Sequence, residues 1–546
     1  MSGIVRKSKF RNTYGTEVKK EFWYENIRPS NCAFDGTFIA CNGKFVAFCV
    51  EVGGAGAFTV IPVSKAGRLD TDLPKVSAHR EYILDIKWNP FDDSMLATSC
   101  EDGSIRLWQF SDHGLLSNID ESKALLTFQL HQRRCTQISW HPIVENVLMS
   151  VSQEPQIAIW NLDNGEAERV INAPKVIHFA EWSIKGDKIV TTDKEKMIRI
   201  YDARSGEELM SCKGHEGQKP QRVVFTFDDT MLFSCGFSKM SERQYAAWSV
   251  TDKIKQLDIG ELDSSNGTLN PIYDPDTQMV YVVAKGDSVI RYYELVKEDP
   301  YFHYITTFQS KDVQKGFTTI PKRCVDVNSC EVMKFYKIVA GSGNKPALIK
   351  PISFTVPRKS ELYQDDLYPD AISNESSCDE PSEWFSGTNF EPKRISMSQF
   401  FKGAVTPSSS AGGGLKKGGL KGLKAKKESK AAGKPAAAPS PTPSEEKSSP
   451  TPVAKSAPVS SAPSASSPAP SSGGVDKDYV AGLEKEIKGL KVSNKEMEKE
   501  IKSLNDKLKD FDKLSGDVKL LCDAVKKNNE RLTSLEALVE EGDDEE

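Results

Sequence analysis

Hydrophobic residues from the start of the chain to about residue 357 come in short runs of β-branched and aromatic side chains, separated by glycine, asparagine, aspartate and proline. Short runs of this composition, bounded by turn-forming residues, are typical of β-strands. Runs that end in an aromatic residue recur as SIRLWQF, QIAIWNL, MIRIYDA, QYAAWSV and VIRYYEL. A second type of run, such as ILDIKWNPFDD, lies about 25 residues before most of them, and the repeat period is about 41 to 52 residues.

A period near ~40–45 residues indicates the blades of a WD-repeat propeller, each made of four antiparallel strands. The recognisable units leave two more strand-rich segments of blade size, before residue 75 and from about 300 to 357. Roughly 350 residues at about fifty per blade give seven blades. The sequence therefore predicts an all-β, seven-bladed WD-repeat β-propeller over residues 1–357. The ring must close, and we expect Phe10–Tyr14 or its neighbours to supply the closing strand.

Four polar and aromatic positions match the buried hydrogen-bonding tetrad of a WD blade: His79, Ser99, Asp102 and Trp108. Two later blades repeat part of this set, His131 with Trp160 and His215 with Trp248. These histidines could instead bind a metal, but the sequence has no cysteine and histidine cluster with zinc spacing. We therefore interpret them as structural and predict no metal site.

The composition changes three times after the propeller. Residues 358–401 alternate aromatic and acidic stretches, which predicts an extension that packs on the propeller. Residues 402–474 hold mainly glycine, alanine, serine, proline and lysine, with eleven lysines against three glutamates, a net charge near +8. No core can form from such a composition, so we predict a disordered basic linker. Residues 542–546 form an acidic tail.

Residues 475–541 have the heptad spacing of an α-helical coiled coil. The a and d positions run from Val480 to Phe511 and continue in a shifted register from Leu514 to Val539. The steps of three residues at 508, 511 and 514 are a stammer, which overwinds the supercoil locally. The alternative is a lone amphipathic helix docked on the propeller.

Charge and cysteine content restrict the class of protein. The net charge of −5 over 546 residues gives no general affinity for nucleic acid. The start of the chain lacks the apolar run of a signal peptide, and no stretch approaches the ~18 apolar residues of a membrane helix. The eleven cysteines are scattered, which indicates a reducing cytosol and thiols in place of disulfides.

Catalytic motifs do not stand out in this sequence. Some propellers hydrolyse esters or lactones, and such a site needs convergent carboxylates, a metal set or a nucleophile with its base. The sequence has no G-x-S-x-G elbow and no H-E-x-x-H helix, and its glycine-rich GGAGAF and AGGGLKKGG lack the P-loop pattern. We therefore predict a protein that is not an enzyme and needs no cofactor.

Both ends of the chain carry motifs that resemble the coronin family. SKFRNTYG at 8–15, YENIRPSNCAFDGTFIACNGKFVAF at 24–48 and GGAGAFTVIPV at 53–63 resemble the start of coronins. DLYPDAI and EWFSG resemble the family's post-propeller extension. In the last helix, four residues match the pattern that short coronins use for parallel trimers: Arg531, Leu532, Leu535 and Glu536.

The resemblance implies a protein that binds filamentous actin, with the branched-actin nucleating complex and cofilin as further partners. It implies that Arg28 contacts the filament and that the coiled coil forms a parallel homotrimer which bundles or crosslinks filaments. It also implies a place in the cytoplasm, on the actin cytoskeleton of the cell cortex. The ending EEGDDEE has no tryptophan beside it, so the acidic tail that some relatives carry is incomplete. The alternative function is a generic oligomeric WD-repeat scaffold in membrane trafficking.

Overall fold

A computed structural model describes residues 8–341 and 346–402. The chain divides into two compact units, residues 1–417 and 418–546, and all described residues belong to the first. The predicted linker, coiled coil and acidic tail, with Arg531, Leu532, Leu535 and Glu536, lie outside the described residues.

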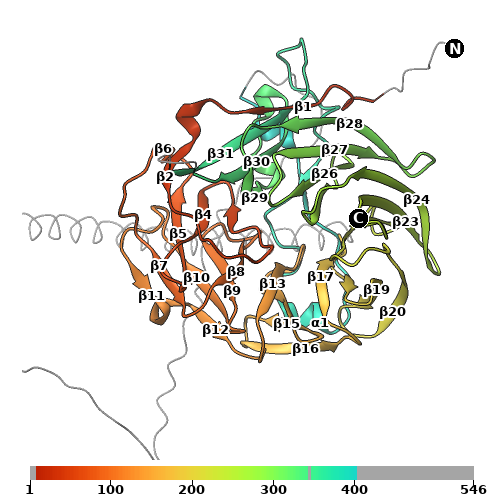
Figure 1. Ribbon diagram of the computed structural model, residues 1–546, viewed down its shortest axis with the longest axis horizontal. Coiled ribbons are helices and arrows are strands. Elements are labelled where there is room, and N and C mark those ends of the chain that lie inside the picture. Colours follow the sequence, from red (N-terminus) through yellow and green to blue (C-terminus); the bar gives the residue numbers. More distant parts are fainter. Residues whose placement is uncertain (1–7, 342–345, 403–546) are drawn as a thin grey trace, which may run out of the picture. The chain divides into compact units, whose positions relative to one another are not determined.

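The described strands form seven sheets around a common axis, together with one small two-stranded sheet (Figure 1). Blades 1 and 2 contain β3 (Ile39–Cys41), β4 (Phe45–Val50), β5 (Gly56–Pro62), β7 (Val76–His79) and β11 (Ile119–Asp120), then β8 (Ile83–Trp88), β9 (Met95–Cys100), β10 (Ile105–Gln109) and β12 (Leu126–Phe128). Blades 3 and 4 contain β13 (Cys135–Trp140), β14 (Val147–Ser152), β15 (Gln156–Asn161) and β16 (Glu166–Asn172), then β17 (Ile177–Trp182), β18 (Lys188–Asp193), β19 (Met197–Asp202) and β20 (Glu208–Lys213). Blades 5 and 6 contain β21 (Arg222–Thr226), β22 (Met231–Phe237), β23 (Arg243–Val250) and β24 (Ile254–Asp263), then β25 (Leu269–Asp274), β26 (Met279–Ala284), β27 (Val289–Leu295) and β28 (Phe302–Gln309). The prediction of a seven-bladed propeller is confirmed.

Blade 7 joins the two ends of the propeller. It contains β29 (Gln314–Thr319), β30 (Glu331–Val339) and β31 (Ala347–Thr355) from the end of the propeller, with β1 (Tyr14–Glu17), β2 (Tyr24–Ile27) and β6 (Gly67–Arg68) from its start. Both β1 and β2 pair antiparallel with β31. The closing strand therefore begins at Tyr14, the last residue of the segment that we expected, while Phe10 is buried and 1% exposed.

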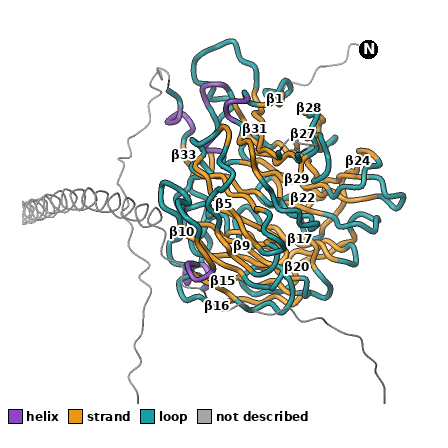
Figure 2. The backbone as a smooth tube through the Cα atoms, turned by 60° about the vertical axis from the view of Figure 1, so that its left-hand side comes forward, coloured by secondary structure: helices purple, strands orange, loops and turns teal. Residues whose placement is uncertain are grey.

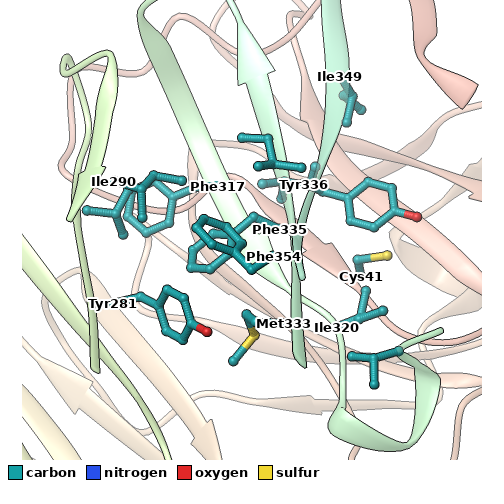
Figure 3. Packing of buried hydrophobic residues seen from close by; sticks show 14 of the residues in the cluster. Cys41, Tyr281, Ile290, Phe317, Ile320, Met333, Phe335, Tyr336, Ile349 and Phe354 are labelled. Carbon is teal, nitrogen blue, oxygen red and sulfur yellow. The ribbon is translucent and has the colours of Figure 1, made fainter. Parts of the chain in front are cut away.

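Aromatic side chains fill the space between blades 6, 7 and 1 (Figure 3). The Phe354 ring lies 5.1 Å from that of Tyr281 and 5.5 Å from that of Phe335, with edge-to-face or tilted geometry. Such arrangements are the favourable ones for aromatic pairs. Successive residues of a strand point to opposite faces, so each blade contributes one face to each of its two neighbours.

The hydrogen-bond chain in blade 2 corrects one predicted residue. The Nε2 of His79 lies 2.9 Å from Thr98 Oγ1, and Trp108 Nε1 donates to the same oxygen at 3.0 Å. The Nδ1 of His79 lies 2.9 Å from Ser104 Oγ, which donates to Asp102. Ser99 is therefore not part of the network, and Thr98 holds that position.

Because neighbouring residues of a strand point to opposite faces, Thr98 and Ser99 lie on different faces of the sheet. Thr98 points with Trp108 towards blade 1, whereas Ser99 Oγ lies beside the thiol of Cys135 in blade 3 and has no hydrogen-bond partner of acceptable geometry. Blades 3 and 5 have the same arrangement with a serine: His131 and Trp160 share Ser150, and His215 and Trp248 share Ser234.

The residues after blade 7 pack against the propeller. They form β32 (Ala371–Ile372), β33 (Arg394–Ile395), the helix α1 (Pro381–Phe385) and the 3-10 helix η5 (Met397–Phe400). Trp384 of α1 is fully buried, its ring 4.7 Å from that of His141 and 5.0 Å from the Arg204 guanidinium. In Figure 2, β33 and the short helix near β15 lie along the same side of the propeller.

Four further 3-10 helices lie in connections of the propeller: η1 (Lys20–Phe22), η2 (Glu121–Lys123), η3 (Lys322–Cys324) and η4 (Val327–Ser329). Within the described residues, no helix has the length and apolarity needed to cross a membrane.

Candidate functional site

Arg28 lies directly after β2, at the start of the connection from blade 7 to blade 1. We call this connection, residues 28–38, the crossing loop. The Arg28 side chain is exposed, and no carboxylate among the described residues forms an ion pair with it. Its charge is therefore available to a partner.

The backbone around Arg28 is held by blade 1. The Arg28 carbonyl accepts a hydrogen bond from the amide of Glu51 at 3.0 Å, and Pro29 forms an antiparallel bridge with Val50. Two residues later, the amide of Ser30 donates to the Cys49 carbonyl at 2.9 Å. The guanidinium thus projects from a backbone that is attached to β4 and to the turn after it.

The far part of the crossing loop lines the axial channel of the propeller, which has a volume of about 560 Å³. Phe34 to Thr37 line it together with residues at the beginnings of the inner strands, such as Leu84 and Arg222. Residues that follow the inner strands, such as Pro142, and Ile372 of the extension also line it. The crossing loop therefore lies at the end of the channel where the inner strands begin.

Charged groups in the channel are partly paired. Asp85 is buried, accepts hydrogen bonds from the amides of Ile86 at 3.0 Å and Ile138 at 3.1 Å, and has a pKa raised by burial. Burial also raises the pKa of Glu181 to about 7, although nearby Lys87 opposes the shift. Asp85 links blades 2 and 3 through its hydrogen bonds, which is a structural role.

The chain matches three family models along its first part. Residues 3–68 match the model described as "Domain of unknown function (DUF1899)", residues 71–109 match "WD domain, G-beta repeat", and residues 349–392 match "Type of WD40 repeat". The chain is also 38% identical over 400 residues to Coronin-2A of Homo sapiens, an alignment that covers 72% of this chain and 74% of that protein. The chain belongs to the coronin family.

A solved coronin structure shares the fold of this coronin. The WD40 domain of Toxoplasma gondii coronin superposes with a TM-score of 0.65 at 30% sequence identity. The match covers 71% of this coronin and 97% of that domain. The family membership and the propeller thus rest on sequence and structure together.

One cluster in this coronin has the composition of a metal site. Ligand atoms of His79, Cys100 and Asp102 lie within 4.8 Å of one another. Both ring nitrogens of His79 are already used in the blade 2 network, and the Cys100 thiol lies 3.3 Å from the Glu81 carbonyl. Burial, together with the nearby charge of Arg106, lowers the pKa of His79 to about 3, so the ring is neutral. The hydrogen bonds favour the structural interpretation of these three residues.

The sequence led us to expect a filament contact at Arg28, which stays a prediction, and it gave no sign of the residues that hold the crossing loop. Arg222 donates to Asp35, which is 187 residues away, and Lys285 donates to the carbonyl of Phe34, which is 251 residues away. Both cations are far from residues 28–38 along the chain, so only the fold brings them to the loop.

Proposed function

We propose that this coronin binds actin filaments through the surface that carries Arg28 and acts without catalysis. The observation that supports the proposal is the exposed Arg28 guanidinium, which has no ion pair among the described residues and projects from a hydrogen-bonded backbone. A guanidinium can hold a carboxylate with two parallel hydrogen bonds, whereas a lysine acts as a point charge. Because no described residue forms an ion pair with Arg28, binding an acidic surface breaks no ion pair of Arg28 within residues 8–341 and 346–402.

The oligomeric part of the proposal concerns the coiled coil predicted for residues 475–541. A parallel homotrimer held by Arg531, Leu532, Leu535 and Glu536 would place three propellers on one molecule. Binding of a second propeller to the same filament is then nearly intramolecular, and such linkage typically raises avidity by ~10²–10⁴ where the geometry permits. Propellers on separate filaments would bundle them. Cofilin and the branched-actin nucleating complex are the further partners we propose, at the actin cytoskeleton of the cell cortex.

Filament co-sedimentation with the full-length protein tests the role of Arg28. Arg28→Asp places a negative charge against an acidic surface, and we expect at least about 10-fold weaker binding, which corresponds to ~1.4 kcal/mol. Arg28→Lys should be intermediate because it keeps the charge but not the paired hydrogen bonds. Arg169→Asp is a matched control, since Arg169 is also exposed but lies on the outer strand β16.

Thermal unfolding should be the same for all three variants, because neither arginine is buried. Wild-type binding by Arg28→Asp would remove Arg28 from the contact. Equal losses in Arg28→Asp and Arg169→Asp would show that only net charge matters.

A further inference from the structure

The crossing loop contacts blades on the far side of the channel. It begins at blade 7 and ends at blade 1, yet its hydrogen-bond partners include Arg222 of blade 5 and Lys285 of blade 6. A connection between neighbouring blades has no need of such contacts. These contacts join the loop to blades 5 and 6 as well as to the two blades that it connects.

Arg222 forms an ion pair with the loop. Its Nη2 donates to Asp35 Oδ2 at 3.0 Å and to the Asp35 carbonyl at 3.1 Å. The Arg222 side chain is 14% exposed and its partner 40% exposed, so the pair is partly shielded from water. The same guanidinium lies 5.6 Å from the ring of Phe179 in blade 4, which keeps it at the channel. One side chain therefore connects the loop to blades 4 and 5.

Two lysines hold the preceding part of the loop. Lys285, in the turn between β26 and β27, donates to the carbonyls of Cys32 and Phe34, and its ammonium lies 4.4 Å from the Phe38 ring. Lys315 of β29 donates to Asn31 Oδ1 at 3.0 Å. Three cations from three blades thus bind successive residues of the loop.

Close backbone approaches restrict the loop further. A Cβ at Gly36 would lie 2.5 Å from the Leu84 carbonyl oxygen of blade 2. A Cβ at Gly316 of blade 7 would lie 2.3 Å from the Thr37 carbonyl oxygen. Neither place has room for a side chain, so the backbone at the end of the loop packs directly against the backbones of blades 2 and 7.

We propose that Arg222, through Asp35, and Lys285 are positioning residues for filament binding, and that they act by keeping the crossing loop and Arg28 in one conformation. This inference rests on the proposed role of Arg28. A surface that is ordered before it binds loses less conformational entropy at the interface. The interaction of Arg28 with its partner therefore depends on an ion pair at the opposite side of the ring.

The experiment compares full-length variants by hydrogen exchange of residues 29–38 and by filament co-sedimentation. Arg222→Gln removes the ion pair, and we expect faster exchange at the amides of Ser30 and Asn31 and about 10-fold weaker filament binding. Arg222→Lys keeps a charged donor and should restore part of both. Asp35→Asn removes the charge on the loop side of the pair and leaves Arg222 in place. It should have the same effect as Arg222→Gln. Arg199→Gln removes two ion pairs of a comparably buried arginine in blade 4, one with Asp193 and one with Glu208, and should change neither readout.

A double-mutant cycle separates positioning from general damage. If Arg222 acts through Arg28, the loss caused by Arg222→Gln should largely disappear when Arg28 is already alanine. An equal loss of filament binding on Arg222→Gln in the wild-type and Arg28→Ala backgrounds would overturn the inference. Two results for Arg222→Gln alone would also overturn it: unchanged exchange of the loop amides, or faster exchange of these amides together with wild-type filament binding. Wild-type binding by Arg28→Ala would instead reject the proposed function. Unchanged loop exchange in Arg222→Gln rejects the positioning role alone, so the two failures can be told apart.

Discussion

Replacing Thr98 with valine removes one hydroxyl from the interior of blade 2 and keeps the shape of the side chain. The hydrogen atoms in this network can be assigned from its geometry. Trp108 Nε1 donates to Thr98 Oγ1, so the Thr98 hydroxyl can donate to His79 Nε2. The Nδ1 proton of His79 then goes to Ser104, whose hydroxyl donates to the Asp102 carboxylate. Thr98 is thus the link between Trp108 and His79.

The cost of Thr98→Val follows from the groups that it leaves without a partner. His79 is 4% exposed and Trp108 is 1% exposed, so water cannot replace the lost hydroxyl. A buried polar group that loses its hydrogen bond costs ~1–3 kcal/mol, which gives ~2–6 kcal/mol for the two. The added methyl group recovers about 0.8 kcal/mol through burial. We expect the free energy of unfolding to fall by about 1–5 kcal/mol.

Ser99→Ala is the matched control on the adjacent position. The Ser99 hydroxyl is buried and has no hydrogen-bond partner of acceptable geometry, so its removal leaves no group unpaired. We expect a change within about 1 kcal/mol of zero. Equilibrium urea denaturation of both variants, with unchanged m-values, measures the difference. A Ser99→Ala variant that is as unstable as Thr98→Val would refute the assignment, and so would a Thr98→Val variant with wild-type stability.

Three further predictions concern the extension, the buried histidines and the C-terminal helix. Trp384→Ala should lower the free energy of unfolding by ~3–5 kcal/mol, because the ring is fully buried. Trp384→Phe should lower it much less, because it keeps an aromatic ring and removes an indole N–H that has no partner among the described residues. Equal losses for the two variants in urea denaturation would contradict this. Burial lowers the pKa of His141 to about 3, so below pH ~6.5 the unfolded chain binds a proton that the native protein does not, and stability falls as the pH decreases. At ~1.4 kcal/mol per pH unit this group removes about 2 kcal/mol by pH 5, and His141→Asn should reduce the pH dependence of unfolding by that amount; the same pH dependence in both proteins would exclude His141 as the cause. Arg531→Ala should break a trimer into smaller species in sedimentation equilibrium of the full-length protein, and a wild-type mass of a dimer or tetramer would reject the trimer.

Most of the propeller was predictable because the information for a strand is local. Each blade carries its own alternating runs and its own turn, such as Asp102-Gly103, and the repeat of these signals along the chain gave the number of blades. The motif around Arg28 is local as well, since it is a continuous stretch of sequence. The face of the sheet on which a side chain lies depends on strand pairing as well as on local sequence. The pairing of β8 with β9 has a register shift between Ile83 and Asp85, and counting along the sequence placed Ser99 where Thr98 lies.

The sequence by itself determined that the first part of the chain is a ring of short strands and that an arginine follows β2. The tertiary structure alone decided which groups surround that arginine. Arg222 and Lys285 reach the crossing loop from blades 5 and 6, and Trp384 reaches His141 from the extension. Such contacts join residues far apart in the chain, and no local propensity or spacing encodes them. The contacts of the crossing loop arise because closing the ring brings the beginnings of the inner strands to one end of the same channel.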